Sequence, residues 1–294
     1  MTIEQFKMLK CVAEEGTLKA ASEKLFKSQA ALSKGIKQLE SQLALQLFDR
    51  NGYRMVLTTE GQRILQLALM LLEKADEIEH LSQHLSAGNE ASVTLAFCTT
   101  FDLRAVLLIL ENIQNQFPET QIIIKQENIS GAIEALHNEL ADLSISFGFD
   151  IQLNHPNLEN QHVNEGSMAN VAAPKLINRH SNLCSVKALL KEYQIVLKDS
   201  GTGTQGTTWG VQDGQRCWYV NDLSTKKMLI LSGMGWGTMP MYLIEQEAQS
   251  GAVQRLNLDD THGDHLMNFY VYKRRNKILG PVASELWLQL GALS

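Results

Sequence analysis

The sequence of 294 residues has few cysteines and no long apolar run. The four cysteines are Cys11, Cys98, Cys184 and Cys217. They are widely separated, without a CxxC pair or a histidine at metal-ligand spacing, so we expect reduced thiols. The most apolar stretch, residues 64–72, is too short to span a membrane and contains Gln66. Because the first residues carry Glu4 and no apolar run, no secretory signal is predicted and a cytoplasmic location is expected.

Motifs for catalysis and nucleotide binding are also missing. There is no GxSxG sequence, and His262, Asp264 and His265 lie in a polar stretch without a further ligand. The stretch HLSQH at residues 80–84 lacks the glutamate of the HExxH zinc motif. Residues 201–206 match GxGxxG after an apolar segment, but no apolar helical repeat follows them. We therefore expect no enzyme activity, no cofactor and no metal site.

Composition and charge indicate a folded chain with a basic front end. Hydrophobic residues make up 44% and charged residues 20%, which is ordinary for a globular protein. The length allows more than one hydrophobic core. Residues 1–57 hold nine Lys or Arg and six Asp or Glu, whereas the remainder holds 17 and 26. This asymmetry is typical of a polyanion-binding module attached to an acidic body.

Three helices are predicted at the front of the chain. Residues 3–15 carry apolar residues at helical spacing, and Gly16 ends this helix. Thr17 can cap a second helix, and Ser28 can cap a third. The residues expected to face inward are Ile3, Phe6, Leu9, Val12, Ala13, Leu18, Ala21, Leu25, Leu32, Ile36, Leu39 and Leu43. This spacing predicts a helix-turn-helix, whose second helix lies in the major groove of DNA.

The start of the third helix carries side chains suited to base edges. Gln29 can pair with adenine, Lys34 with guanine, and Ser33 with either type of base. Ala30 and Ala31 are small enough for close approach and can touch a thymine methyl group. The same pattern also fits a three-helix cap whose polar residues are only solvated, so the helices alone leave both interpretations open.

A β-hairpin is predicted over residues 45–57. An Asn51-Gly52 turn stands between two apolar segments, and Arg50 and Arg54 flank it. Basic residues at this tip are expected to contact the DNA backbone or minor groove and to add affinity that falls with salt. Such a wing favours DNA binding over the solvated cap.

The front end strongly resembles the winged helix-turn-helix of LysR-type transcriptional regulators. The matching residues are Phe6, Val12, Gly16, Thr17, Ala20, Ala21, Leu25, Ser28, Gln29, Leu32, Ser33, Ile36, Leu39, Glu40, Leu43, Leu47, Phe48, Arg50, Leu57, Thr58 and Gly61. Double-stranded DNA is the implied partner, and the predicted contacts are Thr17, Ser28, Gln29, Ala30, Ala31, Ser33, Lys34, Lys37, Arg50 and Arg54. The sequence departs from the family pattern at Lys27, Ala30, Gly35 and Ala44. Because Gly35 is expected to remove a side chain that meets DNA, we expect relaxed base preference.

A long helix is predicted behind the wing, starting at Thr58 or Thr59. Thr59 and Gln62 fit a capping box. Near-heptad apolar spacing predicts a dimerisation seam formed by Ile64, Ala68, Leu71, Ala75, Ile78, Leu81 and Leu85. An arm of this kind is about 40 Å long at 1.5 Å per residue. The alternative is a helix that packs on its own domain.

From Ser92 onward, strands alternate with helices, which predicts α/β lobes. Strands are expected over 93–97, 121–126, 143–147, 170–173, 194–198, 216–220 and 268–273, and helices over 103–116, 129–139, 186–192, 223–232 and 280–290. The Asn- and Gln-rich stretch before residue 170 is expected to be a loop. Thr99 and Thr100 lie where a strand gives way to a helix, so their hydroxyls and the free N–H groups there can hold a carboxylate.

The family resemblance implies the arrangement of this body. Residues 141–145, 232–240 and 250–253 resemble recurrent pieces of a LysR effector domain. The resemblance implies two lobes joined by two crossing strands, as in a periplasmic binding protein, with a small molecule in the cleft. The effector contacts implied by strand ends and by the resemblance are Thr99, Thr100, Asn128, Ser130, Gly148, Phe149, Ser200, Gly201, Thr202 and Met234.

The predicted fold class is α + α/β. A winged helix-turn-helix is expected over 1–58, a linker and dimerisation helix over 59–88, and an effector domain over 89–294. Lobe I is expected from 89–162 with 267–294, and lobe II from 163–266.

The predicted function is that of a LysR-type DNA-binding transcriptional regulator. Its effector, with organic acids among the candidates, is expected to modulate promoter binding and RNA polymerase recruitment. The expected assembly is a homodimer or homotetramer with no membrane partner. Two alternatives stay open: a redox sensor of the same fold acting through Cys98 or Cys217, and a solute-binding or enzymatic α/β protein with a non-functional head.

Overall fold

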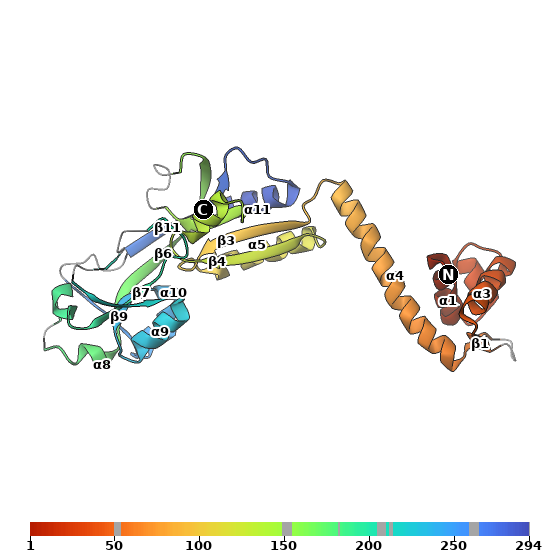
Figure 1. The fold of residues 1–294 in the computed structure, drawn as a ribbon, viewed down its shortest axis with the longest axis horizontal. Helices are drawn as coiled ribbons and strands as arrows, with labels where there is room; N and C mark the ends of the chain where they lie inside the picture. The colour runs from red at the N-terminus through yellow and green to blue at the C-terminus, as the bar shows by residue number, and fades with distance from the viewer. Residues whose placement is uncertain are drawn as a thin grey trace. The chain divides into compact units, whose positions relative to one another are not determined.

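The computed structural model describes residues 1–49, 54–148, 155–181, 183–204, 210–211, 214–258 and 265–293. The chain divides into two compact units, Met1–Ala87 and Gly88–Ser294 (Figure 1). Each unit has its own hydrophobic core.

The N-terminal unit contains three short helices, a small hairpin and one long helix. They are α1 (Ile3–Glu15), α2 (Leu18–Lys24), α3 (Gln29–Leu43), β1 (Phe48–Asp49), β2 (Val56–Leu57) and α4 (Thr59–Ser86). The predicted caps form, because the Thr17 hydroxyl accepts from the Ala20 N–H and the Ser28 hydroxyl from the Ala31 N–H. β1 and β2 pair antiparallel, as the hairpin prediction requires. The Asn51-Gly52 turn lies outside the described residues.

The long helix begins one residue earlier than its predicted capping box. Thr58 is the N-cap and its hydroxyl accepts from the Gly61 N–H at 2.9 Å, so the box of Thr59 and Gln62 is wrong. Thr58 also donates from its backbone N–H to Leu47 O, which ties the helix start to the hairpin. A Cβ atom at Gly61 would overlap Leu47 O, so this close approach requires glycine.

The core of the N-terminal unit follows the predicted apolar stripes with one exception. Leu9, Val12, Leu32 and Leu39 are fully buried in it. Ile3 was expected inside but is 47% exposed, because it is the first residue of α1 and lies ahead of the packed turns.

Gly35 differs from its prediction. It is buried, and a Cβ atom there would overlap the Met8 sulfur of α1. The glycine therefore allows α1 and α3 to approach closely and does not face the exposed side of α3. The predicted loss of a DNA-facing side chain at this position is wrong.

The C-terminal unit is one mixed sheet with helices on its faces. Its elements are β3 (Ser92–Cys98), η1 (Leu103–Val106), α5 (Leu107–Gln116), β4 (Gln121–Glu127), α6 (Gly131–His137), β5 (Leu143–Phe147), β6 (Leu158–Ala172), α8 (Pro174–Ile177), η2 (Val186–Leu189), β7 (Tyr193–Leu197), β8 (Arg216–Val220), α9 (Leu223–Leu231), β9 (Trp236–Pro240), α10 (Met241–Gln249), β10 (Gln254–Arg255), β11 (His265–Arg274) and α11 (Pro281–Gly291). The strand order is β4-β3-β5-β11-β6-β9-β7-β8, with β10 paired to β6.

Two long antiparallel strands, β6 and β11, connect the lobes. β11 pairs with β5 on the lobe I side, and the end of β6 pairs with β9 on the lobe II side. The two strands pair with each other from His265↔Met168 to Arg274↔Leu158. Residues 158–169 of the Asn- and Gln-rich stretch are therefore strand and not the predicted loop. Cross-strand pairing with β11 decides its conformation against its polar composition.

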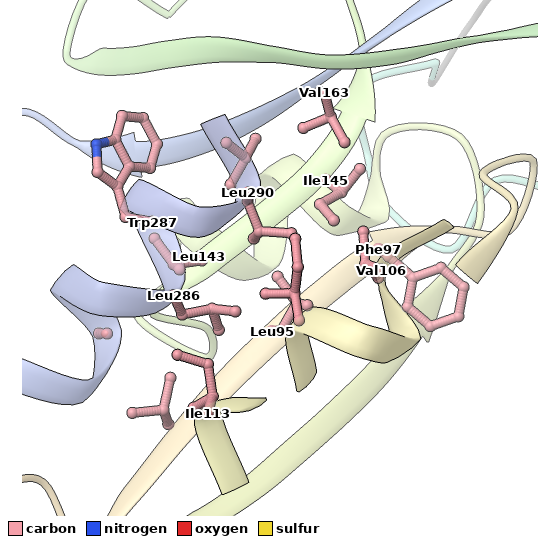
Figure 2. Close-up of a cluster of buried hydrophobic side chains, with 14 of the residues drawn as sticks. Leu95, Phe97, Val106, Ile113, Leu143, Ile145, Val163, Leu286, Trp287 and Leu290 are labelled. Carbon is pink, nitrogen blue, oxygen red and sulfur yellow. The ribbon is translucent and has the colours of Figure 1, made fainter. Parts of the chain in front are cut away.

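Lobe I buries both faces of its inner strands β3 and β5. Alternate β3 residues Leu95 and Phe97 point into a core covered by η1, α5 and α11, as Figure 2 shows for Val106, Ile113 and Leu286. The intervening Ala96 and Cys98 pack toward α6 on the other face. Because side chains alternate between the two faces along β3, the strand is covered by helices on both sides. Its end at Cys98, and Thr99 and Thr100 that follow, therefore lie between two helical layers.

Candidate nucleic-acid interface and ligand cavity

The predicted base-reading residues lie on the solvent side of α3. Ser28, Gln29, Ala30, Ala31, Lys34 and Lys37 are exposed, and Ser33 is half-buried. The opposite side carries Leu32, Ile36 and Leu39, which are buried in the core of the unit. Arg54 is exposed at the hairpin, and Arg50 lies outside the described residues. The hydroxyl of half-buried Thr17 already caps α2.

The turn between α2 and α3 contains two exposed side chains, Phe26 and Lys27. Lys27, which replaces an apolar family residue, pairs with Glu4 of α1 at 3.0 Å. Phe26 in the turn is 96% exposed with a φ of 51°. A bulky residue in the left-handed region is uncommon. This exposed ring is not among the predicted contacts, because an aromatic residue between two helices is usually part of the core.

The predicted dimerisation seam on α4 is partly wrong. Ala68 is buried in the unit's own core and Ile64 packs against it, so neither side chain is available to a second chain. The exposed apolar residues of α4 are Leu67, Leu69, Met70, Leu71, Ile78, Leu81 and Leu85. The stripe of Leu67, Leu71, Ile78, Leu81 and Leu85 keeps heptad spacing, with Lys74 at the intervening position. The packing of α4 on α1 removes Ile64 and Ala68 from the exposed face, whereas the predicted residues Leu71, Ile78, Leu81 and Leu85 remain on it.

Several predicted effector residues are brought together, but they bind one another. The Asn128 N–H donates to the Ser200 hydroxyl at 2.8 Å, and the Asn128 side chain donates to Lys198 O and Asn221 O. The Gly203 N–H donates to the Ser130 hydroxyl at 3.0 Å. These bonds join the start of α6 in lobe I to the loop after β7 in lobe II.

Asp199 is the centre of this cluster. Its carboxylate accepts from the N–H and hydroxyl of Ser130, the N–H of Gly201 and the hydroxyl of Thr204. Burial acts to raise the pKa of the Asp199 carboxyl, but these hydrogen bonds outweigh it and lower the pKa below its ordinary value. The hydrogen-bond donors of Ser130, Gly201 and Thr204 are therefore already bound to a carboxylate of the protein itself. Asp199 is not among the predicted residues, because nothing in its sequence context indicates that a loop of lobe II reaches α6.

A cavity of about 550 Å³ lies between the lobes. Lobe I contributes the ends of β3 and β5, lobe II contributes β7, α9 and β9, and both connecting strands take part. Its described lining is Cys98, Thr100, Ile129, Phe147, Gly148, Met168, Gln194, Ile195, Val196, Leu197, Gly210, Leu223, Lys226, Thr238, His265, Leu266, Met267, Asn268 and Tyr270.

Only two predicted effector residues, Thr100 and Gly148, are part of this described lining. Thr99 lines a second cavity of about 540 Å³, where its hydroxyl accepts from the Gln126 side chain. Met234 is exposed on the surface turn before β9. Phe149 lies outside the described residues. Thr99 and Thr100 point into different cavities because successive residues at a strand end face opposite sides.

Lys226 is the cationic lysine of this cavity. It is 6% exposed, and burial lowers the pKa of its ammonium group to about 8. Gln194 on β7 donates to Gly210 O at 2.7 Å, and the Thr238 hydroxyl donates to Asn170 at 2.8 Å. Lys226 is absent from the predicted set, because a lysine beside a second lysine on a helix is typical of a solvated face.

The cysteines are free, and the described part of the chain contains no disulfide. Burial raises the pKa of the Cys98 thiol and also that of Cys217. Reactive sensor thiols have a lowered pKa, so these surroundings do not favour the redox alternative. Among the described residues no group of three or more His, Cys, Asp or Glu could hold a metal ion. None of the described helices is long and apolar enough to cross a membrane.

Two family models match the chain. One is described as a bacterial regulatory helix-turn-helix protein of the lysR family and covers residues 3–62. The other is described as a LysR substrate binding domain and covers residues 86–293.

The similar proteins extend over nearly the whole chain. The probable HTH-type transcriptional regulator YhaJ of Escherichia coli (strain K12) is 26% identical over 268 residues, covering 89% of this chain and 87% of its own. The solved structure of full-length LysG, an LTTR from Corynebacterium glutamicum, is 18% identical with a TM-score of 0.52, covering 100% and 97% of the two chains. A cysteine mutant of OxyR from the same organism is 19% identical with a TM-score of 0.54, covering 99% and 92%. These structural likenesses show a shared fold.

Proposed function

Because the chain belongs to the LysR family of bacterial transcriptional regulators, we propose that it reads promoter DNA with the exposed side of α3. The chain is a transcriptional regulator with an effector-binding domain. One observation carries the proposal for α3: the polar residues from Ser28 to Lys37 share one exposed side, while the apolar residues of the same helix fill the core. A helix with this arrangement enters the major groove with its first turns against base edges.

Variants of α3 separate base reading from general charge. Gln29→Ala removes a bidentate partner for adenine and is expected to lower affinity for the preferred site by about 1–3 kcal/mol while leaving nonspecific DNA unaffected. Gln42→Ala, at the exposed end of the same helix, is the matched control. A gel shift with DNA that flanks the gene measures both. If the wild-type protein shifts none of this DNA at low salt, the proposal fails.

The salt dependence tests the basic residues. Lys34→Ala removes one cation from the exposed side of α3, and Lys191→Ala removes one from lobe II. If Lys34 contacts DNA, its variant binds more weakly and loses about one released counterion in the salt slope. Equal salt slopes for the two variants would contradict a role for Lys34.

The exposed stripe of α4 supports a homodimer. Leu67, Leu71, Ile78, Leu81 and Leu85 form an apolar face at heptad spacing, and a second copy of the helix covers such a face most fully. Ile78→Glu places a charge in the middle of this face. It is expected to dissociate the protein in sedimentation experiments, whereas Gln83→Glu on a neighbouring exposed face leaves assembly unchanged. A dimeric Ile78→Glu protein would place the interface elsewhere.

The outer strands of the C-terminal unit support further self-association. β4 exposes Ile123 and Ile124 at one edge of the sheet, and β8 exposes Trp218 and Tyr219 at the other. Unpaired edges with large apolar side chains are protein interaction sites when they are not protected. A homotetramer built from two dimers uses these surfaces, and RNA polymerase is the remaining proposed protein partner.

The inter-lobe cavity is the proposed effector site. Lobe I and lobe II each supply a wall, so an effector that prefers one lobe arrangement shifts the population toward it. This preference then biases the spacing of the paired DNA-binding units and thereby transcription.

A further inference from the structure

The ammonium group of Lys226 lies in an unusual position. Lys226 occupies the inward face of α9, between Leu223 and Ile230, which are buried in the core of lobe II. Its side chain packs over β9, where a Cβ atom at Gly237 would lie 3.1 Å from Lys226 Cε and 3.5 Å from Nζ. A long cationic side chain normally reaches solvent from such a helix. Here it ends at the cavity.

Within the described residues Lys226 has neither a carboxylate partner nor a hydrogen-bond acceptor. The next residue shows the contrast: Lys227 pairs with Glu247 at 2.7 Å and donates to Leu243 O at 2.6 Å, at the second cavity. A buried cation without a partner is strongly unfavourable, and proteins keep such groups paired or bound to a ligand. The position of Lys226 therefore calls for an anion that the described protein does not supply.

The cavity is suited to one negative charge on an apolar body. The described lining of the cavity contains no Asp, Glu or Arg. Lys226 is the only Lys or Arg in that described lining. Most of the wall is apolar, formed by Phe147, Met168, Ile195, Leu197 and Leu266 among others. An Arg fork binds a phosphate or carboxylate through two parallel hydrogen bonds, whereas a lysine acts as one point charge. A single lysine matches the single charge of a carboxylate.

We propose that the cavity binds a small organic monocarboxylate whose carboxylate pairs with Lys226 Nζ and whose apolar body lies against the β7 and β11 walls. The inference rests on the proposed function of this cavity as the effector site and names the chemical class of the effector. Thr100 and Thr238 supply hydroxyls at the same cavity for further polar groups of the ligand.

The test compares acids with their uncharged amides on the full chain. Benzoate, phenylacetate and hexanoate, each with its primary amide, are titrated into wild-type protein, Lys226→Met and Lys227→Met, with calorimetry and thermal unfolding as measurements. Acids are expected to bind wild type and Lys227→Met and to raise their melting temperatures, whereas the amides do not. Lys226→Met is expected to bind the acids roughly 10- to 100-fold more weakly, because a charge-assisted hydrogen bond is lost. Lys226→Gln, a second neutral variant, separates the loss of charge from the change of shape.

Three results would overturn the proposal: equal binding of acids and amides, unchanged acid binding by both neutral variants, or no binding of any of the three acids to wild type. A gel shift with Lys226→Met keeps the proposed function separate. Lys226 lies in the C-terminal unit, so this variant is expected to retain DNA binding. Failure of the wild-type protein to bind DNA refutes the promoter-reading proposal and leaves the acid titration to decide the ligand class.

Discussion

Replacing Lys226 by methionine is expected to stabilise the unliganded protein. The pKa of its ammonium falls from 10.5 to about 8 because of burial alone. At about 1.4 kcal/mol for each pKa unit, the cost of holding this charge in the native state is on the order of 3 kcal/mol at neutral pH. Methionine keeps the unbranched shape without the charge, so Lys226→Met is expected to gain about 1–3 kcal/mol.

The pH dependence of this gain follows from linkage. Below pH 8 the lysine is protonated in both native and unfolded states, and the native state bears the full cost. Between about pH 8 and 10.5 the native state releases its proton first, so the unfolded state binds more protons and wild-type stability rises with pH. The advantage of Lys226→Met is therefore expected to be largest near pH 7 and to shrink toward about pH 10.

Urea unfolding followed by tryptophan fluorescence measures the difference in stability between wild type and Lys226→Met in the C-terminal unit. All four tryptophans lie after residue 88, so their emission reports the C-terminal unit alone. Both proteins contain the same other titrating groups, so the contributions of those groups cancel in the difference between the two free energies of unfolding. A Lys226→Met protein that loses stability, or a gain that does not change with pH, would refute the reasoning, since neither result is compatible with an ammonium that is destabilised by burial in the native state.

Three further changes test other parts of the structure. Ala44 caps α3 at a φ of 56°, so Ala44→Gly is expected to gain about 0.5–1 kcal/mol in unfolding followed by circular dichroism; a loss would contradict the left-handed cap. Burial and nearby His137 lower the pKa of His155, so native stability is expected to fall as pH drops below about 6.5, and His155→Phe should flatten this profile. Asp199→Asn is expected to lower the free energy of unfolding by about 1–3 kcal/mol near neutral pH, measured by tryptophan fluorescence. This loss is expected to disappear as pH falls through the lowered pKa of Asp199. A loss that does not change with pH would exclude a role for the charge of Asp199.

Local signals predicted the N-terminal unit well. The caps at Thr17 and Ser28, the helices between them and the hairpin depend on interactions within a few residues, which sequence spacing reports directly. Gly35 was misassigned because its environment is set by Met8, which is distant in the chain. The start of the α4 seam was misassigned for the same reason, since packing on α1 removes Ile64 and Ala68 from the exposed face.

In the C-terminal unit, the alternation of strands and helices sufficed to predict α/β lobes, and the family resemblance supplied their crossing strands. The polar stretch at the start of β6 became a strand only through its pairing with β11. Thr100 and Gly148, which stand at strand ends, are the predicted effector residues that belong to the described cavity lining, and their contact with an effector stays a prediction.

By itself, the sequence determined the class of this regulator through its resemblance to a known family. It determined the polar side of α3 and the alternation of strands and helices through periodicity and local hydrogen bonds. Only the tertiary structure decided which side of α4 is exposed, that Asp199 joins the lobes at α6, and that Lys226 ends in a cavity whose described lining holds no Asp or Glu. These properties depend on which distant surfaces meet, and a buried charge is recognisable only when its surroundings are known.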